Sequence, residues 1–136
     1  MKINKIAHIA IAVRDLETQV AFYRDVLGLE LAGREVVADQ QVKVAMFRVG
    51  SSMIELLEPT SEQSPIAKYL ERRGEGIHHI AYDVDDVAAV LRELADKQVR
   101  LIDDAPRDGA HGAKIAFVHP RSTFGVLSEF CSGTHR

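Results

Sequence analysis

The chain has 136 residues, 46% of them hydrophobic, and a formal net charge of -3. This length and hydrophobic content suit a single domain with a buried core, and the scattered lysines and arginines argue against a nucleic-acid partner. No apolar run approaches the ~20 residues of a membrane span, and the N-terminus does not resemble a signal peptide. Because Cys131 is the only cysteine, no intrachain disulfide can form, and we expect a cytoplasmic protein without a membrane partner.

The first half of the chain predicts a strand, a helix and three further strands. Residues 8–13 alternate small and bulky side chains, which is typical of a strand. We expect a helix to begin after Asp15 as N-cap and to end at Gly28. Its expected apolar face consists of Leu16, Val20, Tyr23 and Leu27. The three strands are expected at residues 30–37, 42–49 and 53–58.

A second helix is expected near the middle of the chain. Ser64 suits an N-cap, Pro65 suits the first helical position, and Gly74 suits the exit from the helix. We therefore interpret residues 63–75 as a helix and linker that join two halves.

The second half predicts the same order of elements. Residues 79–84 indicate a strand, and a helix is expected to begin near Asp85 or Asp86. Its apolar face would consist of Val87, Val90, Leu91 and Leu94. Strands are expected near residues 99–102, 114–118 and 125–131. The polar stretch at residues 103–112 is expected to be a loop that lies over a site.

The two halves are related by an internal repeat. Residues 8–16 align with residues 79–87, about half the chain later. The sequence therefore predicts an α+β domain over residues 1–136, built of two βαβββ modules at residues 1–62 and 76–136. Because one four-stranded sheet is marginally stable alone, we expect the two sheets to join into a curved eight-stranded cup with helices outside.

Each module contains one histidine and one glutamate that could bind a metal ion. His8 and His79 lie on strand faces with small neighbours, and Glu55 and Glu129 lie within apolar strands, each about 50 residues after the histidine of its module. A glutamate in a buried strand is costly unless it is paired or binds a metal. A lone histidine or glutamate of this kind is more often structural, but four of them at repeat-related positions predict a site for a divalent ion with open positions for substrate.

Several stretches give the chain a resemblance that runs nearly end to end. It resembles the methylmalonyl-CoA epimerase family of the vicinal-oxygen-chelate superfamily, which has the glyoxalase fold. The stretches that carry the resemblance are residues 8–13 (HIAIAV), 54–59 (IELLEP), 64–67 (SPIA), 74–81 (GEGIHHIA), 109–114 (GAHGAK) and 117–122 (FVHPRS).

The resemblance implies an isomerase that inverts C2 of methylmalonyl-CoA by removing and returning a proton through a metal-stabilised enolate. It implies metal ligands His8, Glu55, His79 and Glu129, with Glu129 also acting as acid/base. Cobalt, manganese, nickel and zinc all suit these ligands. The resemblance further implies an acyl-CoA substrate and a homodimer. The chain departs from the family at Val44, where some epimerases have a second catalytic glutamate, so the second proton carrier is left unassigned between a water relay and His111.

Three other functions use the same scaffold. A glyoxalase I-like lyase or isomerase, of the lactoylglutathione lyase type, also uses a four-ligand metal set for proton transfer. A metal-free binding protein of the bleomycin-resistance type would not need the histidines and glutamates. An extradiol dioxygenase would use two histidines and one glutamate with iron, and the commoner two-domain forms are longer than this chain.

Overall fold

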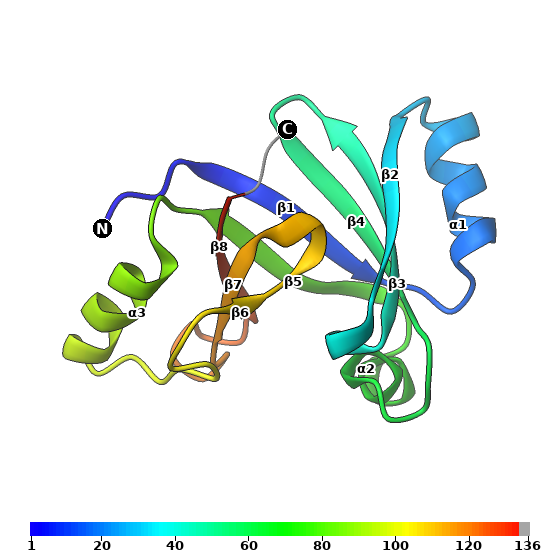
Figure 1. Ribbon diagram of the computed structural model, residues 1–136. Coiled ribbons are helices and arrows are strands. Elements are labelled where there is room, and N and C mark those ends of the chain that lie inside the picture. Colours follow the sequence, from blue (N-terminus) through cyan, green and yellow to red (C-terminus); the bar gives the residue numbers. More distant parts are fainter. Residues whose placement is uncertain (134–136) are drawn as a thin grey trace. The chain divides into compact units, whose positions relative to one another are not determined.

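The computed structural model describes residues 1–133 (Figure 1), and the chain divides into two compact units. The central unit is Ile9–His78, and the terminal unit combines Met1–His8 with the chain from His79 onward. Strands β1 (Lys5–Ala12) and β5 (Gly76–Asp83) each run from one unit into the other.

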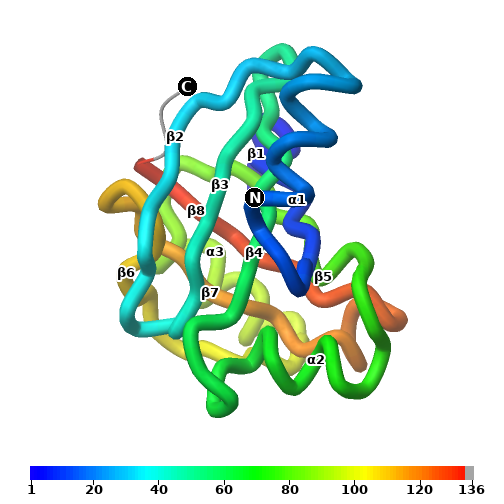
Figure 2. The backbone as a smooth tube through the Cα atoms, turned by 90° about the vertical axis from the view of Figure 1, so that its right-hand side faces the viewer, coloured from blue at the N-terminus to red at the C-terminus, as the bar shows by residue number. Residues whose placement is uncertain are grey.

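The central unit contains an antiparallel sheet. Its strands are β2 (Glu30–Val37), β3 (Val42–Val49) and β4 (Ser52–Pro59), which lie side by side in Figure 2, and the end of β1 lies next to β4. The helices of this unit are α1 (Leu16–Ala21) and α2 (Pro65–Arg73), with a π-helical turn at Phe22–Val26 and a 3-10 turn at Ala38–Gln40. The three strands predicted after the first helix are therefore confirmed.

The first helix begins as the sequence predicts but ends differently. The Thr18 amide donates to the Asp15 side chain, which confirms the N-cap. The π-helical turn, closed by the Leu27 amide on the Phe22 carbonyl, shifts the apolar face after Ala21. Leu27 is therefore 51% exposed, and Leu29 packs against the core instead, so the predicted place of Leu27 on the apolar face is wrong.

One face of the central sheet packs against α1. Leu16 and Val20 of the helix contact a cluster with Ala45, Phe47 and Leu56 of the sheet. The neighbouring residues along β3 and β4 point to the other face, because strand side chains alternate. That other face carries Val42, Val44, Met46, Met53, Glu55 and Leu57.

The terminal unit contains β5, β6 (Arg107–Asp108), β7 (Lys114–Val118) and β8 (Ser128–Ser132) in the order β5-β8-β7-β6, with the first part of β1 next to β5. Its helices are α3 (Val87–Asp96) and a 3-10 turn at Ala110–Gly112. Strand β8 runs parallel to β5, whereas β7 is antiparallel to β8. The helix predicted near Asp85 or Asp86 is confirmed, with Asp86 as its N-cap.

Two strands of the terminal unit differ from the prediction. Residues 99–102 form no strand, because only Leu101 makes a bridge, to Val118, and the third strand of this half is β6 instead. Strand β8 begins at Ser128 rather than at residue 125, because Phe124 and Gly125 have φ values of 59° and 103° and the Gly125 amide closes a turn on the Pro120 carbonyl.

The two faces of the terminal sheet are buried differently. Helix α3 covers one face, where Val87 and Leu91 pack against Val84, Val118 and Phe130. The other face carries a second cluster made by Ala7, Ala81, Ala113, Ile115, Phe117 and Cys131. Within residues 1–133, no helix is long and apolar enough to cross a membrane.

Candidate metal centre

Three of the predicted site residues meet within the terminal unit. His8 comes from β1, His79 from β5 and Glu129 from β8. The Nε2 atoms of the two histidines are 3.3 Å apart. The Glu129 Oε1 atom lies 3.0 Å from the His79 Nε2 and 3.6 Å from the His8 Nε2. Three ligand atoms from three strands therefore lie within 4.8 Å of one another.

The register of the sheet explains why Glu129 meets these histidines. Glu129 pairs with Ala81 of β5 on one side and with Phe117 of β7 on the other. His79 precedes Ala81 by two residues and so lies on the same face. This is the face opposite α3, and the small side chain of Ala81 leaves room beside the histidine.

All three side chains are buried, with exposed fractions of 6% for His8, 5% for His79 and 4% for Glu129. Burial by itself would raise the pKa of Glu129. The charge of His8 and hydrogen bonds from both histidines outweigh burial and hold the pKa of Glu129 well below its ordinary value. The carboxylate is therefore ionised at neutral pH and can act as a ligand or accept a proton.

The distances between these atoms fit ligands of one ion. Two donors at about 2.1 Å from the same ion stand about 3.0 Å apart at right angles and about 3.4 Å apart in a tetrahedral arrangement. The separations of 3.0 and 3.3 Å fall within this range, and the third, 3.6 Å between Glu129 Oε1 and His8 Nε2, is slightly longer. Two imidazoles and one carboxylate are also a donor set that first-row divalent metals accept, with positions left for other ligands.

One aromatic side chain contacts the cluster within the same unit, and a charged pair lies against that aromatic ring. The Phe117 ring meets the His79 ring edge-on, with 5.1 Å between centroids, and is 7% exposed. The Arg107 guanidinium lies 5.6 Å from the Phe117 centroid and pairs with Asp103 at 3.3 Å. Phe117 is not among the site residues predicted from the sequence, although strand alternation from Ile115 places it on the ligand face.

Glu55, the fourth residue of the predicted set, belongs to the central unit. It lies on β4 opposite Met46, on the face that does not pack against α1, and it is 7% exposed. His78, next to His79, points elsewhere and meets the Tyr69 ring at 4.9 Å. His111 lies in the 3-10 turn with a φ of 56° and is exposed.

Comparison with known proteins places the chain in a family. Residues 7–117 match the model of the Glyoxalase/Bleomycin resistance protein/Dioxygenase superfamily. An uncharacterised Bacillus subtilis protein, YqjC, is 46% identical over 94% of this chain and 91% of its own length. The ethylmalonyl-CoA/methylmalonyl-CoA epimerase of Cereibacter sphaeroides is 40% identical, over 93% of this chain and 96% of its own length.

A solved structure of a relative has the same fold as this chain. A variant of the Streptomyces coelicolor methylmalonyl-CoA epimerase, in complex with 2-nitronate-propionyl-CoA, has a TM-score of 0.93 and 42% identity, covering 96% of this chain and 95% of that one. The expected α+β glyoxalase fold class is confirmed. Together with the family model and the epimerase relative, this likeness shows that the chain belongs to the glyoxalase/bleomycin resistance protein/dioxygenase superfamily and, within it, to the methylmalonyl-CoA epimerase family.

Proposed function

We propose that the protein epimerises methylmalonyl-CoA at C2 with the help of a divalent metal ion. The observation that carries this proposal is the cluster of His8, His79 and Glu129 on one face of a sheet, in a chain related over nearly its full length to epimerases. Glu55 is proposed as the fourth ligand, which would keep an oxygen donor at the position where some epimerases have glutamine.

The chemistry follows from the acidity of the substrate. C2 of a malonyl thioester lies between a thioester carbonyl and a carboxylate, and loss of its proton places negative charge on the carbonyl oxygen. A bound divalent ion would supply the positive charge that stabilises this oxygen. Glu129 accepts the C2 proton through a carboxylate oxygen on one face, and a second acid returns a proton to the opposite face, which inverts the centre.

The surroundings of Glu129 suit this role. Burial raises the pKa of Glu129, but the charge of His8 and hydrogen bonds from both histidines lower it further, so the carboxylate is ionised and is also a weaker base than an ordinary glutamate. The histidine rings and Phe117 restrict where its oxygens can point, since His8 and His79 meet edge-on at 5.3 Å between centroids and Phe117 backs His79. A proton acceptor held in this way needs little reorganisation during proton transfer.

The metal, the extent of the domain and the oligomeric state complete the proposed function. We propose cobalt, manganese, nickel or zinc as the metal, since nitrogen and carboxylate donors accept each of them. We propose one functional domain over residues 1–136, with modules at 1–62 and 76–136, working as a cytoplasmic homodimer on an acyl-CoA. Two-fold dimers are the commonest oligomers of soluble proteins.

Proton exchange tests this function directly. The purified protein, loaded with cobalt or manganese, is incubated with one stereoisomer of methylmalonyl-CoA in heavy water, and NMR follows the C2 hydrogen beside a chelator-treated control. We expect metal-dependent exchange with loss of stereochemical purity. Absence of exchange with metal bound would refute epimerase activity and favour the glyoxalase-like alternative, which turnover of methylglyoxal with glutathione would reveal. Absence of metal binding would favour the metal-free binding protein.

A further inference from the structure

An arginine lies on the same face of the terminal sheet as the candidate metal ligands. Arg107 of β6 pairs with Ile115 of β7, and directly paired residues of an antiparallel sheet share a face. Ile115 belongs to the cluster that also contains Phe117, on the side of the sheet opposite α3. His79 and Glu129 lie on this side, which is called the ligand face below. Arg107 therefore places a positive charge on the ligand face.

Phe117 lies between this arginine and the metal ligands. The Arg107 guanidinium carbon is 5.6 Å from the centroid of the Phe117 ring, and the same ring meets the His79 ring at 5.1 Å between centroids. Attraction between the cation and the aromatic ring helps to keep the guanidinium there. The guanidinium is therefore one aromatic ring away from His79, a span that an acyl-CoA held beside the metal ligands covers.

A carboxylate fixes the direction of the guanidinium. Asp103 Oδ1 lies 3.3 Å from Arg107 Nε, and Asp103 Oδ2 accepts a hydrogen bond of 2.8 Å from the Phe117 amide. The Asp103 amide in turn donates to the Phe117 carbonyl at 3.2 Å. Because Asp103 is tied twice to the backbone of β7, it holds Arg107 at Nε. The end of the guanidinium, with Nη1 and Nη2, points away from this contact.

The end of the guanidinium can pair with an anion from outside the protein. Within residues 1–133, neither Nη atom of Arg107 has a hydrogen-bond or ion-pair partner. The Arg107 side chain is 37% exposed, so a ligand can reach it, while the rest of it is shielded from water. Partial shielding strengthens the attraction between opposite charges. The planar fork of an arginine pairs with two oxygens of a carboxylate or a phosphate.

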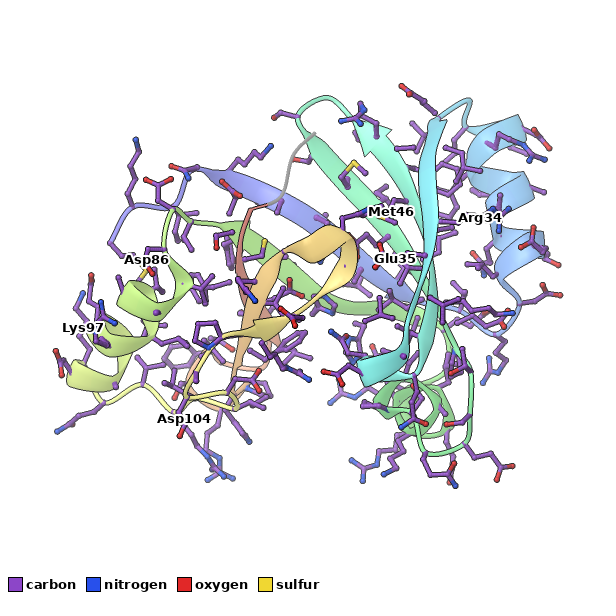
Figure 3. The ribbon with its side chains drawn as sticks, in the orientation of Figure 1. Arg34, Glu35, Met46, Asp86, Lys97 and Asp104 are labelled. Atoms are coloured by element: carbon purple, nitrogen blue, oxygen red, sulfur yellow. The ribbon has the colours of Figure 1, made fainter. Side chains whose placement is uncertain are left out.

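Two other basic side chains of the terminal unit lie away from the ligand face. Lys114 is on the opposite face, because side chains alternate along β7, and it pairs with Asp108. Arg92 is exposed on α3, the helix that runs between the labelled Asp86 and Lys97 in Figure 3 and covers that opposite face. Arg92 therefore serves as a matched control for Arg107, with the same residue type in the same unit.

We propose that Arg107 binds an anionic group of the acyl-CoA substrate on the ligand face. This inference rests on the proposed function, whose substrate has a carboxylate on its acyl part and phosphates on its CoA part, all ionised at neutral pH. Nη1 and Nη2 donate hydrogen bonds to two oxygens of one of these groups. Asp103 is a positioning residue, since it orients Arg107 and does not itself contact the substrate.

The binding of two thioesters tests this role and distinguishes the two kinds of anion. Calorimetry measures the Kd of methylmalonyl-CoA, supplied as the equilibrium mixture of its C2 stereoisomers, and of propionyl-CoA, which has the same phosphates but no acyl carboxylate. Each protein is the full chain loaded with cobalt. Since a hydrogen bond to a charged group contributes substantially to affinity, we expect Arg107→Gln to weaken methylmalonyl-CoA binding about 10- to 100-fold.

The propionyl-CoA titration then identifies the anion. Weakening confined to methylmalonyl-CoA assigns the acyl carboxylate to Arg107, and equal weakening of both thioesters assigns a CoA phosphate. Arg107→Lys keeps the charge but not the planar fork, so it should recover part of the affinity. Arg92→Gln should bind both thioesters as the wild type does.

Three results would overturn the role of Arg107. The first is binding of both thioesters by Arg107→Gln within about 3-fold of the wild type. The second is equal weakening by Arg92→Gln, and the third is a fall in cobalt content that accounts for the loss, because Arg107 would then act on the metal ligands through Phe117.

Two controls separate a failed variant from a failed function. Circular dichroism shows whether each variant is folded, and if Arg107→Gln is not, Arg107→Lys carries the comparison because it can keep the ion pair with Asp103. Exchange of the C2 hydrogen is measured for the wild type in parallel. No exchange by the wild type refutes the proposed function, whereas exchange together with unchanged binding by Arg107→Gln refutes only the role of Arg107.

Discussion

Replacement of Phe117 by leucine tests whether the aromatic packing beside His79 holds the metal ligands in place. Phe117 is 7% exposed, and its ring stands at 85° to the His79 ring with 5.1 Å between centroids. Truncation of a buried phenylalanine to alanine costs about 3–5 kcal/mol, so the smaller change to leucine should cost about 1–2 kcal/mol and leave the protein folded. Loss of a group that orients a metal ligand typically costs about 10- to 100-fold in metal affinity. We therefore expect a fall of that size for Phe117→Leu.

Phe130 provides the matched control for this experiment. It is also 7% exposed and lies on β8 beside Glu129, but it packs under α3 on the opposite face of the sheet. Denaturant unfolding should show a similar loss of stability for Phe130→Leu, whereas competitive metal titration should show an affinity close to that of the wild type. Equal losses of metal affinity in the two variants would refute the reasoning, because they would show that general destabilisation, not the contact with His79, controls the site.

Three further changes probe the base, a helix cap and a tight loop. Glu129→Gln should lower C2 exchange about 10²- to 10⁴-fold, and NMR in heavy water checks this; near-normal turnover would remove Glu129 from the mechanism. Ser64→Ala should lower the free energy of unfolding by about 1 kcal/mol, because the buried Ser64 hydroxyl accepts from the Ile66 amide, and an unchanged denaturant midpoint would contradict the cap. Gly109→Ala should cost about 1–3 kcal/mol, because the added Cβ would stand 2.8 Å from the buried Ile115 side chain, and thermal unfolding would reveal an unexpectedly neutral change.

The sequence by itself determined the structural elements that depend only on residues close together in the chain. Asp15, Ser64 and Asp86 cap helices as predicted, because a cap needs only a side-chain oxygen within three residues of the amide that it accepts from. The repeat also identified the two histidines and Glu129, since an acid inside a buried strand is unusual wherever the strand lies. Neither inference required knowledge of which strands pair.

The elements that depend on pairing were decided by the tertiary structure. Residues 99–102 have the composition of a strand, yet β7 pairs with β6 at Arg107–Asp108 and leaves only Leu101 as a bridge. The approach of Glu129 to His79 likewise depends on β8 running parallel to β5, which the sequence of neither strand specifies. Pairing partners far apart in the chain are chosen by the whole core, not by local preference.

The position of Glu35 shows why the face that a strand side chain occupies depends on the tertiary structure. Strand β2 pairs Glu30 with Arg48, and a bulge between Leu31 and Gly33 then shifts the register by one residue. Without that extra residue Glu35 would face Lys43 on the α1 side of the sheet, but with it Glu35 faces Val44 on the side of Glu55. Alternation along one strand can be predicted from sequence, whereas the face that each side chain occupies depends on a bulge that only the paired strands determine.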